Sequence, residues 1–315
     1  MNDSESQAMN DSPSESSDPA RSTHSIPRRL SLVRIAKTIL PLVIFLILAA
    51  FLGQTINKAR GDFAVRQFSF TKLNPLWLSI SAVLYLLGSV PPWLYFHNVL
   101  RAMGQQPTMY ESFRAFYIGH LGKYVPGKFM VVLLRTGLLE SPRTSKTATG
   151  VAVFIETLTT MAVAATLAAI YVAFYFRHQP ILLTGAIASS LGIATFVIPS
   201  VFRAVVKTIK LRRMNPDIET QLLGLNAPLT ISGWLTIAAS WLVMGLSLWA
   251  SIMAMTDCGV LPQGSASRLL HVREVLPLLT ACVCLAVVAG FVSMIPGGVG
   301  AREIVVTEML PPLLG

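Results

Sequence analysis

Two short elements of the sequence combine a Pro-Gly pair with basic residues, and they are the strongest candidates for chemistry. The first runs from Gly122 to Lys128 (GKYVPGK) and the second from Ile295 to Glu303 (IPGGVGARE). A Pro-Gly pair ends a helix, and a helix that restarts after the turn exposes backbone N–H groups that favour an anion. Each element is therefore a candidate cradle for a phosphate group. The alternative is an interfacial turn whose basic residues only set the membrane topology.

Glu156 is the one acidic residue inside a long apolar stretch. A carboxylate near the middle of a membrane is costly, so it usually faces a partner or a water-filled cavity. Glu156 could pair with Arg135 or with Arg302, or it could relay a proton. It also follows Lys146 by only 10 residues, so a hydrated position near the cytoplasmic end of its helix is an equal alternative.

Patterns typical of a catalytic triad, of paired catalytic carboxylates or of a metal site do not occur in the sequence. The three cysteines, Cys258, Cys282 and Cys284, have neither zinc-site nor disulfide-framework spacing and are expected to be structural. We therefore expect no metal, no cofactor and no catalytic residues, and binding rather than catalysis.

Composition indicates the elements that position these residues. Hydrophobic residues make up 53% of the chain and charged residues 13%, and mean hydropathy is +0.61. A soluble domain has about 25% charged residues, and here the apolar residues form runs long enough to span a bilayer. The sequence predicts an all-α, polytopic transmembrane bundle. Its six predicted spans lie near 38–57, 74–98, 148–176, 180–202, 229–255 and 275–296.

Two further apolar segments are too short to span and contain the candidate elements. They lie around 102–135 and 297–315 and are predicted to be re-entrant or interfacial. Residues 1–30 are polar and are predicted to be a disordered cytoplasmic tail, which leaves 31–315 as the integral membrane domain.

The net charge of +10 comes from basic residues in the predicted loops. With the N-terminus inside, 18 of the 25 Lys and Arg residues fall on the cytoplasmic side, as the positive-inside rule requires. The sequence therefore predicts a multi-pass inner-membrane protein with a cytoplasmic N-terminus. Its expected partners are membrane lipids with anionic headgroups rather than nucleic acid.

The run from Leu121 to Lys128, followed by Arg135 and Glu156, resembles the lysylphosphatidylglycerol synthase transmembrane-region family, and Ile295 to Glu303 resembles its second motif. The resemblance covers roughly residues 35 to 315. It implies a multi-span inner-membrane module that, in the best-known members, flips aminoacylated phosphatidylglycerol between leaflets. Relatives that stand alone are linked to glycolipid or polyprenyl-phosphate-sugar pathways.

The resemblance also implies which residues form the site. Seven residues become candidates for contact with a lipid headgroup: Lys123, Tyr124, Lys128, Arg135, Glu156, Arg302 and Glu303. Six residues become the turns that position them: Pro126, Gly127, Pro296, Gly297, Gly298 and Gly300.

The chain departs from the family pattern in two ways. It has no soluble aminoacyltransferase domain, so lysyl transfer is not expected. It also ends 12 residues after Glu303, which suggests a short member or a truncated reading frame. We expect flippase-like movement of an anionic phospholipid or lipid-linked phosphate. The alternatives are a transferase or accessory subunit acting on polyprenyl-phosphate sugars and a non-catalytic scaffold, with a homo-oligomer or a separate transferase as possible partners.

Overall fold

The computed structural model describes residues 70–124, 129–139, 141, 143–175, 180–208, 217–258, 267, 269–293, 295 and 298–310. They all belong to the compact unit Leu48–Gly315, whereas the other unit, Met1–Ile47, lies outside the described residues. The predicted tail 1–30 and the first predicted span 38–57 therefore also lie outside them.

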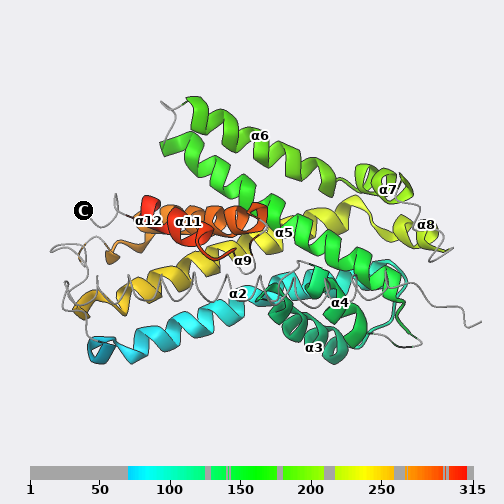
Figure 1. Cartoon of the computed structure of the whole chain (residues 1–315), viewed down its shortest axis with the longest axis horizontal. Coiled ribbons are helices and arrows are strands. Elements are labelled where there is room, and N and C mark those ends of the chain that lie inside the picture. The colour runs from blue at the N-terminus through cyan, green and yellow to red at the C-terminus, as the bar shows by residue number, and fades with distance from the viewer. Residues whose placement is uncertain are drawn as a thin grey trace, which may run out of the picture. The chain divides into compact units, whose positions relative to one another are not determined.

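The described residues form helices and no strands, which confirms the predicted fold class (Figure 1). The α-helices are α2 (Pro75–Ala102), α3 (Met109–His120), α4 (Phe129–Leu138), α5 (Lys146–Tyr175), α6 (Pro180–Val197), α7 (Pro199–Thr208), α8 (Ile218–Gln221), α9 (Ala227–Met253), α11 (Val272–Val292) and α12 (Ala301–Met309). The 3₁₀ helices are η1 (Phe70–Lys72), η2 (Leu121–Tyr124), η4 (Leu222–Gly224) and η5 (Thr256–Cys258).

Four of the described helices, α2, α5, α9 and α11, are long and apolar enough to cross a membrane. They correspond to the predicted spans 74–98, 148–176, 229–255 and 275–296. The predicted span 180–202 is divided, because α6 ends at Val197 and α7 begins at Pro199. Proline lacks an N–H group and its ring collides with the carbonyl four residues earlier, so a helix restarts at this position more readily than it continues.

The starts of the long helices have local causes in the sequence. The side chain of Asn74 accepts a hydrogen bond from the Leu76 N–H at 3.0 Å, with Pro75 in the first turn of α2. Asn226 accepts in the same way from the Leu229 N–H at 3.0 Å, which moves the start of α9 two residues ahead of the predicted one. A side-chain oxygen in this position satisfies a backbone donor that the helix leaves unpaired.

Helix α5 lies at the centre of the packing. It contacts α2, α4, α6, α9 and α11, while α2 packs along α9. Small residues permit the close approach of α2 and α9: the Ser81 hydroxyl lies 2.8 Å from the Ser247 carbonyl, and the Ser240 hydroxyl donates to the carbonyl of Gly88. Between membrane helices, such packing and hydrogen bonding replace the hydrophobic drive that acts in water.

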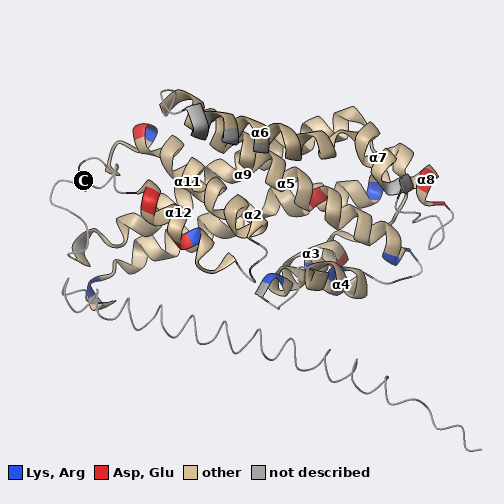
Figure 2. Ribbon diagram, turned by 45° about the horizontal axis from the view of Figure 1, so that its top comes forward, with Lys and Arg blue, Asp and Glu red and all other residues tan. Residues whose placement is uncertain are grey.

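The two segments predicted to be too short to span contain short helices. Helices α3 and α4 pack against each other as a hairpin joined through η2, and α12 packs on α11. Figure 2 shows that charged positions are sparse along α2 and α9, whereas both signs of charge occur on α3 and α12. Helix α4 carries one charged residue, Arg135. The candidate elements therefore place their charges at short helices beside the long ones.

The first turn of α3 is stabilised by Glu111. Its carboxylate accepts a hydrogen bond from the Thr108 N–H at 2.7 Å, and the Thr108 hydroxyl accepts from the Glu111 N–H at 3.2 Å. The bond from Thr108 holds the pKa of Glu111 below its usual value. A carboxylate with a lowered folded-state pKa stabilises the fold above its unfolded-state pKa, and this contribution is lost as the pH falls through the folded-state value.

We expect Glu111→Ala to cost about 0.5 kcal/mol at neutral pH and less in acid. Thermal unfolding in detergent at pH 7 and at an acidic pH would measure the difference. Glu308→Ala, in the exposed last turn of α12, is the control and should show no such loss. An equal cost at both pH values would contradict the assigned role of the Glu111 carboxylate.

Candidate functional site

The α3–α4 hairpin holds the first basic element through two glycines. A Cβ atom on Gly119 would collide with the Arg135 Cγ atom, and one on Gly122 would lie 2.8 Å from the Val131 backbone nitrogen. Only glycine allows α4 to approach α3 and η2 so closely. This contact fixes Arg135 against α3 and Lys123 at the turn between the two helices.

Arg135 forms a buried ion pair with Glu156, so the structure selects one of the pairing alternatives left open by the sequence. The Arg135 Nη1 atom lies 2.8 Å from the Glu156 Oε2 atom, and the side chains are only 2% and 7% exposed. The Thr160 hydroxyl donates to the Glu156 Oε1 atom at 3.3 Å. The two charges come from α4 and α5, so the pair links the hairpin to the central helix.

Aromatic rings enclose the guanidinium of Arg135. Its Cζ atom lies 4.2 Å from the centroid of the Phe116 ring and 5.2 Å from that of Phe96. The faces of these rings carry negative electrostatic potential and attract the cation. The Nε atom of Arg135 has no hydrogen-bond partner among the described residues, so Glu156 and the rings supply the stabilisation shown there.

The second element holds Arg302 between two glycines. A Cβ atom on Gly290 would lie 2.7 Å from the Arg302 Nε atom, and one on Gly298 would lie 2.8 Å from it. Gly298 has a φ of +70°, a conformation that side chains disfavour. The Arg302 Nε atom is buried and lacks a hydrogen-bond partner among the described residues. The glycines therefore fix the stem of Arg302 beside the end of α11.

Cations of the α3–α4 hairpin and of the second Pro-Gly element influence one group, His120. The protein atoms around the ring lower the pKa of His120, and the positive charges of Lys123, Arg135 and Arg302 lower it further. The residue is exposed, and its ring stacks on Phe116 with 5.9 Å between the ring centroids. A lowered pKa keeps this imidazole uncharged at neutral pH. The region around His120 thus combines three cations with a neutral donor or acceptor.

The structure assigns Glu303 a local role. Its Oε2 atom accepts a hydrogen bond from the Gly300 N–H at 2.7 Å, so the carboxylate caps the N-terminus of α12. An anion-binding helix end needs free N–H groups there, and Glu303 occupies one of them. Gly300, with a φ of +87°, forms the turn that leads into the helix, as expected for a turn-forming residue.

Several predicted site residues lie outside the described part of the chain. They are Pro126, Gly127, Lys128, Pro296 and Gly297, together with the side chain of Tyr124. Among the described candidates, Arg135 is brought together with Glu156, and Lys123 and Arg302 lie close enough to influence His120.

Three neighbours of the site were not identified from the sequence. Phe96 and Phe116 enclose Arg135, and Gly290 lies against Arg302. Phe96 falls in a predicted span among many apolar residues, and no spacing relates it to Arg135. Gly290 lies near the end of an apolar stretch, and nothing in the sequence indicates that the Arg302 side chain packs against it.

Residues 38–315 match the family described as lysylphosphatidylglycerol synthase TM region. Searches of the curated proteins and of the solved structures gave no match. The matched range contains both Pro-Gly elements, the α3–α4 hairpin and the buried ion pair. The chain is a multi-pass membrane protein that belongs to the lysylphosphatidylglycerol synthase TM region family.

Proposed function

We propose that this protein translocates an anionic phospholipid or lipid-linked phosphate between leaflets in a flippase-like manner. In this proposal it lies in the inner membrane with its N-terminus in the cytoplasm. The observation that supports the proposal is the buried Nε atom of Arg302, which has no hydrogen-bond partner among the described residues. The positive charges of Lys123, Arg135 and Arg302, which all lower the pKa of His120, agree with it. Two of these cations come from η2 and α4, which follow one another in the hairpin, and the third comes from α12, which is far from both in the sequence.

Electrostatics favours a phosphate as the ligand. Like charges at one place in a poorly polar environment repel each other more strongly than they would in water, and a bound anion relieves that repulsion. Arginine also presents a planar set of donors that matches phosphate oxygens. Lys123 and Arg302 are the proposed headgroup contacts, and neutral His120 can donate or accept one further hydrogen bond.

Arg135 has a different proposed part from that of Lys123 and Arg302. Its guanidinium is buried and engaged by Glu156, so it would act on the headgroup through its field and through the position of α4. Glu156 would act as the counter-ion that keeps Arg135 in place.

The experiment uses the purified full chain in liposomes that contain fluorescently labelled phosphatidylglycerol. We expect the wild type to move label between leaflets and Arg302→Gln to be slower by about tenfold, since a hydrogen bond to a charged group contributes about 1.5–3 kcal/mol. Arg273→Gln is the matched control, because Arg273 is an exposed arginine in the first turn of α11, at the opposite end of that helix from Gly290.

Two results would overturn the proposal. One is that the wild type leaves the leaflet distribution unchanged for all three lipids tested: phosphatidylglycerol, its lysyl derivative and a polyprenyl phosphate. The other is the release of a product from a polyprenyl-phosphate sugar by the purified chain, which would indicate a transferase.

A further inference from the structure

An apolar groove lies between helices α6–α7 and α9, outside the cation site. Its volume is about 330 Å³, and its lining includes Leu191, Ala194 and Ile198 on one side and Ala227, Ile231 and Trp234 on the other. Helix α6 packs on α5, and α9 packs on α2, α5 and α11. The groove is therefore the space between two helices that both pack against α5. One of them, α9, is long and apolar enough to cross a membrane.

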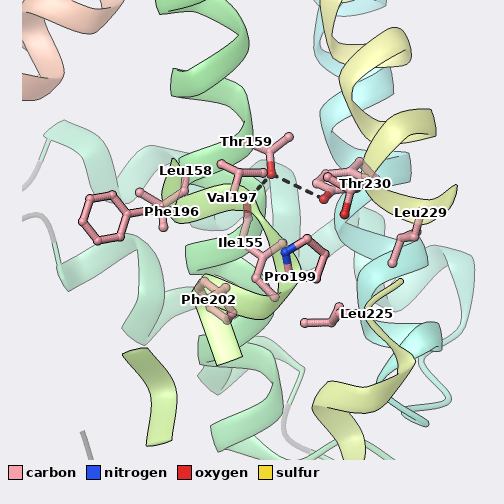
Figure 3. A pocket seen from close by; sticks show the side chains of 11 residues that line it. Ile155, Leu158, Thr159, Phe196, Val197, Pro199, Phe202, Leu225, Leu229 and Thr230 are labelled. Atoms are coloured by element: carbon pink, nitrogen blue, oxygen red, sulfur yellow. Dashed lines mark hydrogen bonds between the residues drawn. The ribbon is translucent and has the colours of Figure 1, made fainter. Parts of the chain in front are cut away.

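The inner end of the groove narrows to a crevice of about 10 Å³ that shares Val197, Pro199 and Thr230 with it. Figure 3 shows Ile155 and Thr159 of α5 at this crevice, facing Pro199 and Thr230. A space of this size holds one water molecule at most. The Thr159 hydroxyl lies 3.3 Å from the Tyr95 hydroxyl, so a pair of hydroxyl groups closes the apolar path.

A cation lies at the end of the groove where α7 begins. The Nε atom of Arg203 donates to the Pro199 carbonyl at 3.1 Å, and Pro199 lines both the groove and the crevice. This hydrogen bond holds the guanidinium within one helical turn of the groove. An arginine beside an apolar groove complements a molecule with a hydrocarbon chain and an anionic head.

We propose that this groove binds the hydrocarbon chain of a phosphate-bearing membrane lipid, with Arg203 at its phosphate. The lining matches a hydrocarbon chain because it is almost wholly apolar. The charge of Arg203 selects an anionic lipid over a zwitterionic one. The groove would bind the same class of lipid as the proposed function, but Arg203 is not one of the cations on which that function rests.

Photocrosslinking in liposomes tests the proposal. The full chain is reconstituted in phosphatidylcholine with a trace of phosphatidylglycerol or phosphatidylcholine that carries a diazirine in the middle of one chain. After illumination, labelled peptides are identified by mass spectrometry. We expect label on residues 191–199 and 227–234. The labelling yield there should be about fivefold higher for phosphatidylglycerol than for phosphatidylcholine, because an exposed ion pair contributes up to about 1 kcal/mol.

Matched variants separate the groove from general lipid contact. Ala194→Trp fills the groove and should lower its labelling by about tenfold, whereas Ala239→Trp adds the same volume to an exposed position of α9 and should not change it. Thr230→Phe fills the groove from the opposite helix and replaces Ala194→Trp if that variant does not fold. Arg203→Gln should abolish the preference for phosphatidylglycerol, and Arg203→Lys should retain it.

Equal labelling by the two lipids in the wild type would overturn the proposal, as would labelling that Ala194→Trp and Thr230→Phe leave unchanged. The Arg302→Gln variant keeps the two proposals distinguishable. It should label the groove like the wild type while translocation falls. Loss of translocation in Arg302→Gln with no groove labelling in any variant would support the proposed function and exclude the groove.

Discussion

Replacing Glu156 with glutamine should lower the free energy of unfolding by about 3–5 kcal/mol, because the variant leaves the Arg135 charge buried without its counter-ion. Arg135 is 2% exposed and Glu156 is 7% exposed in their side chains, so water cannot replace the lost partner. Arg135→Met should cost a similar amount by leaving the carboxylate unpaired. Unfolding in detergent, followed by tryptophan fluorescence, would measure both effects.

The double variant Arg135→Met with Glu156→Met supplies the critical comparison. Removing both charges should recover much of the stability lost in either single variant, since replacing a buried pair by apolar residues is often close to neutral. Glu308→Gln, at an exposed position of α12, should change stability by at most about 0.5 kcal/mol. Additive losses in the double variant would show that the two charges do not stabilise each other.

Gly122→Ala should destabilise the protein by about 1–3 kcal/mol, the usual cost of overpacking. The added Cβ atom would lie 2.8 Å from the Val131 nitrogen and 2.9 Å from the Met130 carbonyl carbon. Both are backbone atoms, so no side-chain rotation relieves the contact and α4 must move away from η2. Because Lys123 follows directly, we also expect slower lipid translocation.

Gly137→Ala is the matched control within the same hairpin. A Cβ atom on Gly137 meets nothing within 4 Å, and alanine favours the helical conformation over glycine by about 1 kcal/mol. Gly137→Ala should therefore raise the melting temperature in detergent while Gly122→Ala lowers it. A shift of the same sign in both variants would contradict the tight contact between η2 and α4.

Local and one-dimensional properties of the fold could be predicted from the sequence. Hydropathy predicted the ends of the four long helices to within a few residues, because the bilayer requires about 20 apolar residues in a row. The Asn residues before α2 and α9 stabilise helix starts through contacts within three residues. The break at Pro199 was missed because the flanking segments are both apolar, and hydropathy averages over a proline.

The candidate site depended on the sequence for its residue types and on the tertiary structure for its partners. Two Pro-Gly elements with basic residues indicated the regions proposed as the site, but the sequence allowed Glu156 to pair with Arg135 or with Arg302. Helix packing decided for Arg135, because Gly119 and Gly122 let α4 approach α3 closely and so bring the guanidinium to α5. Such a choice depends on distances between helices, which spacing along the chain does not contain.

The sequence alone thus determined that the chain is a helical membrane protein with basic, glycine-containing turns, since hydropathy and backbone conformation are properties of short segments. Only the tertiary structure decided that Arg135 is a buried, paired charge enclosed by Phe96 and Phe116, while Arg302 lies between Gly290 and Gly298. The physical reason is that burial and ion pairing depend on how separate helices pack, and many packings are compatible with the same apolar runs.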